Sequence, residues 1–242
     1  MIKKFCDESF KFPVIGIIHS CYKEKFGIPR QPGLVPSASG AIEIVAPYNN
    51  PAAFDGLDQC SHIWVQFVFH QSLQHEWRPK VRPPRLGGNK TLGVFATRSP
   101  VRPSPIGLSV VKLDSINLGN GVQLNISGGD FLDATPVLDI KPYVPYVDIV
   151  GEATNCIADA APAMLPVRFT EEVIQLIVKT ENPQLLQQLI KEVLQQDPRP
   201  RYQKTDSTRT YGMKLNCYDV RWRYLEYEHG DEIEVVALAS AI

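Results

Sequence analysis

The chain has 242 residues, of which 44% are apolar, with 25 Lys and Arg against 26 Asp and Glu. This composition is typical of one globular domain, or of one domain with an appendage. No run approaches the roughly 18 apolar residues of a membrane helix, and the N-terminus lacks the apolar stretch of a signal peptide, so we expect a cytoplasmic protein that does not enter a membrane. The five cysteines are scattered without a CxxC pair, which argues against a disulfide framework and a zinc site, and no metal is predicted.

The first 150 residues are predicted to form strands separated by turns. The strands are expected at Val14–Ile18, Ala41–Val45, Ser61–Phe69, Leu92–Thr97, Leu108–Ile116, Val122–Ser127 and Val137–Ile140. About seven strands without helical periodicity between them favour a mainly β fold, a small antiparallel or mixed β-barrel. No GxGxxG motif follows a strand, which argues against a Rossmann fold.

Composition changes near residue 150. The Ala- and Pro-rich stretch Asn155–Pro166 is expected to be a linker. Thr170 is placed to cap a helix, and Asn182-Pro183 is placed to begin a second one. Tyr211–Glu228 and Glu232–Ala239 then predict a hairpin, which gives a C-terminal α+β appendage. The predicted divisions are a barrel domain at 1–150, a linker at 151–168 and an α+β domain at 169–242.

One segment concentrates the positive charge. The thirty-six residues from Arg78 to Leu113 contain eight Lys or Arg and no acidic residue, and their prolines disfavour regular helix. Such a segment is either a preformed anion site or a solvated basic loop, and charge alone favours neither. Within it Arg85, Arg98 and Arg102 are candidate ligands for carboxylate or phosphate, because a guanidinium forms paired hydrogen bonds with both groups.

Three further positions are candidates for binding or catalysis. Asp130 follows a predicted strand, where a carboxylate either bonds ribose hydroxyls or stabilises a turn. Spacing favours the turn for its neighbour Asp133. His62 lies in an apolar strand, where a lone histidine is more often a core residue than a catalyst. Tyr22 lies in a second loop that carries Lys and Arg residues.

The C-terminal region carries another group of cations, interleaved with tyrosines and a tryptophan. These cations are Arg199, Arg201, Lys204, Arg209, Lys214, Arg221 and Arg223. Aromatic rings among cations favour RNA, whose splayed bases stack while its phosphates pair. The same aromatic residues in a hairpin are also consistent with an ordinary core.

Several of these runs resemble the TsaA-like family. They are PPRLGGN (Pro83–Asn89), GVFATRSPVRPSPIGLS (Gly93–Ser109) and DATPVLDIKPYVPY (Asp133–Tyr146). Two C-terminal runs, QDPRPRYQK (Gln196–Lys204) and DVRWRY, resemble the bacterial TrmO-type branch of that family. The resemblance therefore covers nearly the whole chain.

This resemblance implies an S-adenosylmethionine-dependent tRNA methyltransferase. Its implied substrate is N6-threonylcarbamoyladenosine (t6A) at position 37, next to the anticodon, which is methylated on N6 to m6t6A. The resemblance also implies a barrel outside the Rossmann and knotted methyltransferase classes, a homodimer, and a C-terminal region that helps to bind tRNA. The implied cofactor-binding residues are Ser20, Cys21, Tyr22, Ser61, His62, Arg98, Asp130, Phe131 and Leu132. The residues expected to bind the substrate tRNA are Arg85, Arg102, Arg199, Arg201 and Lys204.

The implied reaction has a weak nucleophile, because the N6 lone pair is conjugated with both the purine and the carbamoyl group. In-line positioning is expected to supply much of the rate, since the methyl donor is already activated. A base that removes the N6 proton would help, and His62 and Tyr22 are both candidates. Arg98 or Arg85 is expected to pair with the threonyl carboxylate, which places Arg98 among the catalytic candidates.

Two other functions fit the residues. A non-catalytic RNA-binding barrel would show no saturable binding of S-adenosylmethionine, and a metal-dependent hydrolase using the aspartates of Gly128–Tyr143 is disfavoured by the surrounding positive charge.

The chain departs from the family pattern at three positions. Cys21 stands where the family usually has Pro, Ser104 where it has Asn, and Ala134 where it has Gly.

Overall fold

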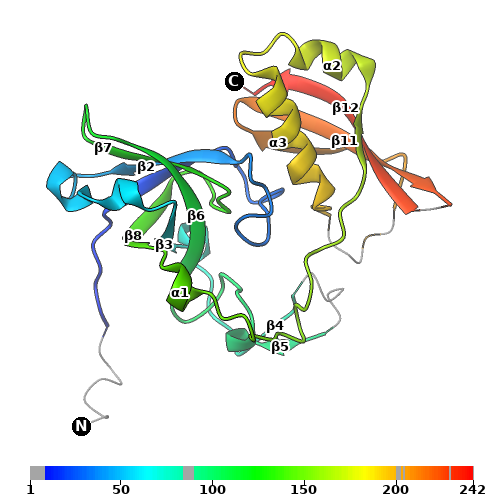
Figure 1. Ribbon diagram of the computed structural model, residues 1–242. Coiled ribbons are helices and arrows are strands. Elements are labelled where there is room, and N and C mark those ends of the chain that lie inside the picture. The colour runs from blue at the N-terminus through cyan, green and yellow to red at the C-terminus, as the bar shows by residue number, and fades with distance from the viewer. Residues whose placement is uncertain (1–8, 84–89, 200–202, 204, 229, 242) are drawn as a thin grey trace.

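The N-terminal half of the chain forms a closed six-stranded barrel. The structure is a computed structural model that describes residues 9–83, 90–199, 203, 205–228 and 230–241. The barrel strands are β1 (Gly16–Ser20), β2 (Ser39–Ile44), β3 (His62–Val68), β6 (Ile106–Asn117), β7 (Val122–Ser127) and β8 (Thr135–Pro142). Their order around the barrel is β1-β2-β7-β6-β3-β8, and every neighbouring pair is antiparallel (Figure 1).

Alternation along the strands explains why this sequence closes into a barrel. In β7 the side chains of Val122, Leu124 and Ile126 are buried, whereas Gln123 between them is exposed. Such a period of two sends alternate side chains inward, and closure removes the sheet edges. The predicted mainly β barrel is therefore confirmed. The strand predicted at Leu92–Thr97 is largely wrong, because only a two-residue β5 pairs there before a short 3-10 turn begins.

Other short elements lie at the edges of the barrel. Strands β4 (Lys80–Val81) and β5 (Leu92–Gly93) pair as a small two-stranded sheet within the basic segment. The one-turn helix α1 (Pro145–Asp148) follows β8. The side chain of Asp148 accepts hydrogen bonds from Trp64 Nε1 at 3.0 Å and from the Val144 amide at 2.8 Å. Asp148 thereby fixes this helix to the outside of the barrel.

The C-terminal region is a four-stranded sheet with two helices on one face. The strands are β9 (Val167–Phe169), β10 (Tyr211–Leu215), β11 (Tyr218–Tyr227) and β12 (Gly230–Ser240), in the order β10-β11-β12-β9. The helices α2 (Glu171–Ile177) and α3 (Pro183–Gln195) begin where Thr170 and Asn182 predicted. Neither side chain makes a capping hydrogen bond, so the capping role expected of Thr170 is wrong.

The predicted hairpin differs from the observed strands in one respect. The segment expected to form a single strand from Tyr211 to Glu228 is divided into β10 and β11. The break is a tight turn at Asn216, whose φ of 53° lies in the left-handed region that asparagine tolerates better than most residues. The turn brings Asn216 to the barrel, where its amide donates to the Cys21 carbonyl oxygen at 2.7 Å.

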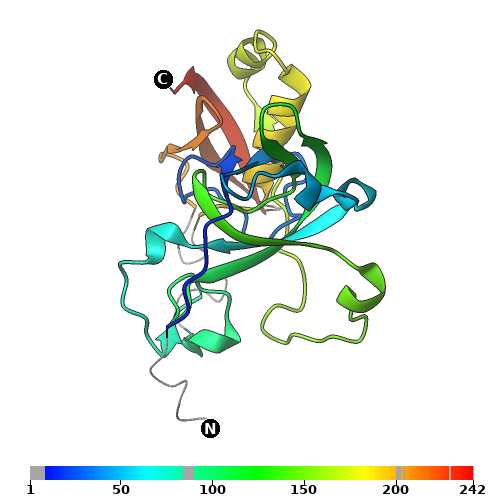
Figure 2. The ribbon, with the colours of Figure 1, turned by 90° about the vertical axis from the view of Figure 1, so that its left-hand side faces the viewer.

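The β1–β2 loop (residues 21–38) joins the two halves of the molecule. Its residues Cys21, Tyr22, Val35 and Ala38 are buried in the same apolar cluster as Trp222 and the α3 stripe, not in the barrel core. Figure 1 shows this loop, in blue, reaching from the barrel toward α3, and Figure 2 shows the same proximity from the side. Although the loop belongs to the barrel in sequence, it forms part of the C-terminal core.

Candidate functional site at the barrel mouth

Arg98 and Asp130 lie at the end of the barrel from which residues 21–38 and 128–134 emerge, here called the barrel mouth. Ser109 faces into the barrel from β6 and is 2% exposed, and its hydroxyl donates to Asp130 Oδ1 at 2.7 Å. Arg98 follows the 3-10 turn Val94–Ala96 and donates from Nη1 to Gln31 Oε1. The structure thus combines one half-buried carboxylate with one exposed guanidinium at the mouth.

Burial dominates the electrostatics of this carboxylate. Burial raises the pKa of Asp130 above its ordinary value, because removing an ionised carboxylate from water is costly. The hydrogen bond from Ser109 and the positive charge of Arg98 oppose that rise without cancelling it. Arg98 is therefore close enough to act on Asp130 electrostatically, and a cationic ligand at the mouth would favour the ionised form further.

The predicted residues Ser20, Cys21 and Tyr22 form the junction between the barrel and the C-terminal sheet. Burial raises the pKa of the Cys21 thiol to about 12. The Tyr22 hydroxyl is buried without a hydrogen-bond partner among the described residues, and burial raises its pKa far above the ordinary value. A hydroxyl in this environment holds its proton at neutral pH, so the structure does not support Tyr22 as a base.

Tyr22 instead connects two parts of the structure through its backbone. It forms a β-bridge with Leu132 of the barrel and a second one with Leu215 of the C-terminal sheet. The Tyr22 carbonyl also accepts from the Asp133 amide at 2.9 Å. Asp133 accepts from the Ser20 amide at 2.7 Å and pairs with Lys23 at 2.9 Å, so its role is a long-range contact rather than a local turn. The loop that carries Asp130 is thereby tied to the C-terminal sheet.

His62 lies away from Arg98 and Asp130. It begins β3, is exposed, and pairs in register with Lys112, whereas Ser109 pairs with Val65 three positions further along. Three residues of strand span about 10 Å and reverse the face, so His62 is on the outer surface of the barrel. Ser61 Oγ lies 3.0 Å from its Nδ1. The sequence-based prediction of a core histidine is therefore wrong, and a single chain does not bring His62 beside Arg98.

The remaining predicted cofactor residues lie inside or beside the loop of Asp130. Phe131 is 2% exposed and packs edge-on against Phe67, with ring centroids 4.9 Å apart, so it belongs to the barrel core. The Leu132 carbonyl accepts from the Thr135 hydroxyl at 2.6 Å. Both residues support the backbone of the mouth rather than projecting from it.

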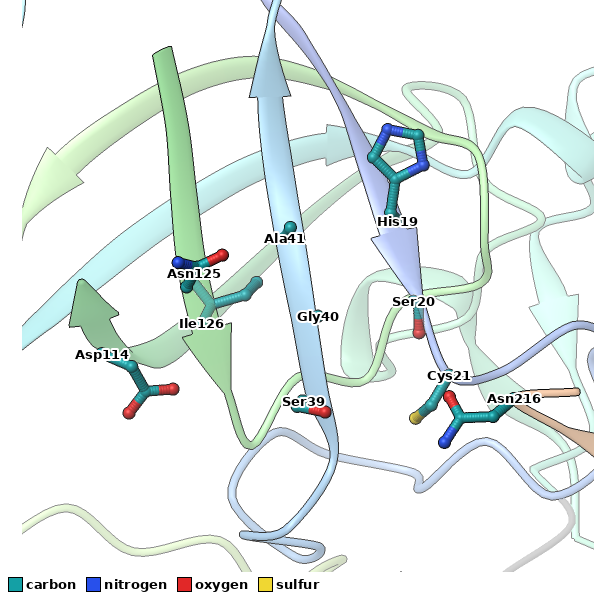
Figure 3. Close-up of a pocket in the computed structure, with 10 residues that line it drawn as sticks. All are labelled: His19, Ser20, Cys21, Ser39, Gly40, Ala41, Asp114, Asn125, Ile126 and Asn216. Atoms are coloured by element: carbon teal, nitrogen blue, oxygen red, sulfur yellow. The ribbon is translucent and has the colours of Figure 1, made fainter. Parts of the chain in front are cut away.

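A depression of about 440 Å³ lies on the outer side of the barrel, against the C-terminal turn (Figure 3). The residues that line it are His19, Ser20, Cys21, Ser39, Gly40, Ala41, Asp114, Asn125, Ile126 and Asn216. Ser20 and Cys21 are among the predicted cofactor residues, whereas Arg98, Asp130 and His62 do not contribute to its lining. We place the candidate site at the mouth rather than here, because the predicted site residues Arg98 and Asp130 lie at the mouth.

The basic segment and the β1–β2 loop come together beside the mouth. Arg98 of the basic segment bonds Gln31 of the loop, and Lys25 of the loop donates from Nζ to the carbonyl of Gln71, which precedes the basic segment, at 3.2 Å. Arg102 donates to the Thr97 carbonyl at 3.1 Å. The segment is thus held against a second cationic loop, which concentrates positive charge on one side. Arg85 lies outside the described residues, as do Arg201 and Lys204.

Arg199 does not behave as a surface cation. Its side chain is 8% exposed and donates to Asp197 at 3.0 Å, to Thr205 at 2.8 Å and to Asp231. Its guanidinium also lies 4.0 Å from the centre of the Tyr224 ring. With its donors used inside the protein, Arg199 is not placed to bind tRNA phosphates, contrary to the sequence-based expectation.

Other cations of the C-terminal group are paired with acidic neighbours. Arg221 bonds Asp219 at 3.0 Å, and Arg223 and Arg168 both bond Glu234, at 2.6 and 2.9 Å. In the described parts of the chain, the open face of this sheet therefore carries charges of both signs rather than a basic patch.

Two residues of the site were missed in the sequence. The sequence contains a feature that could have identified Ser109, because it is a polar residue at an inward position of an alternating strand. No local sequence feature identifies Gln31, since its contact with Arg98 joins residues 67 positions apart.

The departure from the family pattern at Ala134 has a structural consequence. Ala134 adopts a φ of 60°, where a residue with a Cβ is strained and glycine is not. Its amide donates to the Ile18 carbonyl at 2.9 Å, which ties the strained turn to β1. A family preference for Gly at this position is consistent with that backbone.

The described ranges contain no cluster of three or more His, Cys, Asp or Glu that could hold a metal ion. They also contain no helix of the length and apolar character needed to cross a membrane.

Comparison with known families decides the relationship. The profile of the tRNA-methyltransferase O N-terminal domain matches residues 17–149, and that of the TrmO C-terminal domain matches residues 162–241. The chain belongs to the TrmO family. The first match spans the barrel and its mouth, and the second spans β9 to β12, so both halves of the fold are those of the family.

Individual members of the TrmO family resemble the chain over most of its length. It is 50% identical over 220 residues to the tRNA (adenine(37)-N6)-methyltransferase of Escherichia coli K12, covering 89% of this chain and 93% of that protein. It is 51% identical over 214 residues to a Pseudomonas aeruginosa protein named putative S-adenosylmethionine-dependent methyltransferase RcsF, covering 87% and 90%. A crystal structure of TrmO from Pseudomonas aeruginosa superposes with a TM-score of 0.76 at 40% identity, covering 96% and 99% of the two chains.

Proposed function

We propose that the chain methylates N6 of N6-threonylcarbamoyladenosine at position 37 of tRNA, converting t6A to m6t6A in the cytoplasm. As a member of the TrmO family, the chain is an S-adenosylmethionine-dependent tRNA methyltransferase that acts on N6 of adenine 37. The single observation that supports the finer assignment is the position of the Arg98 guanidinium at the barrel mouth, close enough to Asp130 to act on that carboxylate electrostatically. It offers a cation to the threonyl carboxylate that distinguishes this substrate from unmodified adenosine.

The charges at the mouth also fit the cofactor. The amino-acid part of S-adenosylmethionine carries an ammonium and a carboxylate, and its sulfur is positively charged. A half-buried carboxylate at Asp130, fixed through one oxygen by Ser109, suits either cation. The guanidinium of Arg98 suits the cofactor carboxylate or the substrate carboxylate. When bound, the cofactor supplies a methyl group that is already activated for transfer.

The protein's contribution to the reaction is mainly to hold the reactants in position. Neither of the two predicted bases lies beside Arg98 in one chain, since the Tyr22 hydroxyl is buried and holds its proton, and His62 is about 10 Å along the strand on the outer face. We therefore propose that in-line positioning accounts for most of the rate. The N6–carbon bond forms as the sulfur–carbon bond breaks, and the N6 proton passes to water.

The tRNA is proposed to bind along the basic segment and the β1–β2 loop. Lys25 and Arg102 lie on this side with Arg98, next to the mouth. Phosphates close to the reactive nucleotide would meet Lys25, Arg98 and Arg102 here, whose printed hydrogen bonds go to carbonyl or carboxamide oxygens, whereas Lys23 of the same loop and the cations of the C-terminal sheet are paired with carboxylates. The C-terminal domain, 169–242, is proposed to contribute to tRNA binding through residues other than Arg199.

A homodimer is also proposed. Large apolar side chains are exposed on and near β6, at Ile106, Leu108 and Phe95, and at Tyr146 of α1. Exposed apolar groups of this size mark interaction surfaces in many proteins. Light scattering on the purified chain tests this, because a single species at the monomer mass would refute it.

The decisive experiment compares two tRNA substrates. Purified protein and methyl-labelled S-adenosylmethionine are incubated with a tRNA that carries the threonylcarbamoyl group on adenosine 37, and with the same tRNA lacking it. We expect label in the first tRNA only, at N6 of the modified nucleotide. Equal labelling of both tRNAs would refute the assignment of the modified substrate and leave the methyltransferase activity intact.

A further inference from the structure

We propose that Gln31 is a positioning residue that orients the Arg98 guanidinium for methyl transfer, on a loop that the C-terminal domain holds in place. The proposal deepens the proposed function, since it rests on Arg98 acting at the barrel mouth. Gln31 is not part of the barrel wall, and it contacts Arg98 across 67 residues of sequence.

The first step is the anchoring of the loop. Glu192 of α3 accepts from both the amide and the hydroxyl of Ser37, at 2.9 and 2.6 Å, and the Gln196 side chain donates to the Leu34 carbonyl at 3.2 Å. Both contacts lie C-terminal to Gln31 in the β1–β2 loop. They fix that end of the loop to a helix of the other domain.

The N-terminal end of the loop is anchored to the same domain. The Cys21 carbonyl accepts from the Asn216 amide at 2.7 Å, and Glu24 accepts from the Lys214 amide at 2.9 Å. Phe26 stacks on Trp222 with ring centroids 5.9 Å apart and an interplanar angle of 7°. The loop therefore approaches Arg98 as a structure secured at both ends.

The anchored loop restricts the side chain of Arg98. An exposed arginine has several rotamers, and restricting them costs conformational entropy. Arg98 donates to the Gln31 carboxamide oxygen, and its charge acts on the Asp130 carboxylate. A guanidinium held by a neutral acceptor keeps its full positive charge, and its other N–H groups stay available for a ligand carboxylate. Gln31 thus restricts the direction of Arg98 without neutralising it.

The experiment measures methylation by full-length variants with the modified tRNA. We expect Gln31→Ala to lower kcat/KM for S-adenosylmethionine by about tenfold or more, because a small misplacement of a positioning group has effects of that size or greater. The KM for tRNA and the melting temperature are expected to stay close to the wild-type values. Gln31→Glu keeps an acceptor but adds a negative charge that pairs with the Arg98 guanidinium, so it is also expected to lower kcat/KM by about tenfold or more, and wild-type activity of this variant would overturn the proposal that a neutral acceptor is required.

The matched control is Gln59→Ala. Gln59 is exposed, where Gln31 is half-buried, and it also makes a side-chain hydrogen bond, to Asp58 at 2.9 Å, but it lies in a 3-10 turn before β3 and is not the hydrogen-bond partner of Arg98. We expect wild-type kinetics from this variant. A loss equal to that of Gln31→Ala would mean that the assay responds to the loss of any glutamine side chain, and would overturn the proposal.

A double-mutant comparison separates positioning from a merely structural role. If Gln31 acts through Arg98, then Gln31→Ala has little further effect in the background of Arg98→Lys, which lacks the planar guanidinium. An equal loss in both backgrounds would overturn the proposal, and so would wild-type or higher activity of Gln31→Ala alone. If Arg98→Lys itself is fully active, the site assignment under the proposed function fails instead.

Discussion

Replacing Arg199 with alanine is expected to destabilise the fold rather than weaken tRNA binding. The guanidinium is 8% exposed, bonds Asp197, Thr205 and Asp231, and stacks on the Tyr224 ring. Removing one partner of a buried ion pair leaves uncompensated carboxylates, at a cost of about 3–5 kcal/mol. The two aspartates keep 24% and 19% of their side-chain exposure, so water relieves part of this cost.

A loss of about 3 kcal/mol is therefore expected for Arg199→Ala, including the cation–π contact. For a chain of this size each kcal/mol lowers the melting temperature by about 2–4 °C, which predicts a decrease of about 6–12 °C. The matched control is Arg221→Ala, whose side chain is 59% exposed and pairs with Asp219 at the surface. Exposed pairs contribute about 0–1 kcal/mol, so this variant is expected to melt near the wild-type temperature.

The loss of stability caused by Arg199→Ala should also depend on pH in a defined direction. Burial alone would raise the pKa of Asp231, but hydrogen bonds from Thr205 and Arg199 bring it below the ordinary value. A depressed carboxylate contributes stability above its ordinary pKa and loses it as the pH falls through the folded value. The difference in melting temperature between Arg199→Ala and the wild type is therefore full at pH 7 and narrows below about pH 4.

Thermal melts and tRNA titration on the folded variant provide the assay. We expect a lower melting temperature together with unchanged affinity for tRNA below the melting range. A variant that melts like the wild type but binds tRNA more weakly would refute the reasoning and restore Arg199 as a tRNA ligand.

Three further outcomes are expected. Arg98→Ala should reduce methylation by about 100-fold or more while the melting temperature stays constant, because a guanidinium at the site is lost; near-wild-type methylation would contradict the site. Asp130→Asn should melt higher than the wild type at pH 8 and lose methylation. Because folding raises the pKa of Asp130, the wild type is most stable below about pH 4 and loses stability as the pH rises through the pKa of Asp130 in the folded protein. The difference in melting temperature between Asp130→Asn and the wild type should therefore vanish at about pH 4. Ala134→Gly should raise stability by about 0–1 kcal/mol, since left-handed strain of about 1–2 kcal/mol is relieved against the added entropy of unfolded glycine; a lower melting temperature would contradict this.

Much of the fold is predictable because it depends on local patterns. The barrel strands follow from alternation of apolar and polar residues, as in β7, whose bounds agree with the predicted Val122–Ser127. The helices begin after Thr170 and Asn182, where residue type and spacing predict them. The strand predicted at Leu92–Thr97 was wrong for most of its length. The apolar β-forming residues there are interrupted by a glycine and lie in proline-rich surroundings, and only two residues of the segment pair with β4.

The candidate site was predictable only in part. The residue types follow from the sequence, since Arg98 lies in the acid-free basic segment and Asp130 follows a predicted strand. Their surroundings depend on contacts between distant segments, and a charge count cannot distinguish a free guanidinium from one that is already bonded. Arg199 and Arg98 are both arginines in proline-rich segments, yet one is buried among two carboxylates and the other meets a neutral carboxamide.

The sequence by itself determined the barrel, the appended α+β region, the concentration of cations between Arg78 and Leu113, and the resemblance to a methyltransferase family. All of these reside in local composition, periodicity or motif order. Only the tertiary structure decided that the β1–β2 loop packs into the C-terminal core, that Tyr22 is buried, and that His62 faces outward. These properties depend on which apolar surfaces pack together and which polar groups lose contact with water as a result. Such burial is decided by contacts between segments that are distant in the sequence, so local sequence patterns do not predict it.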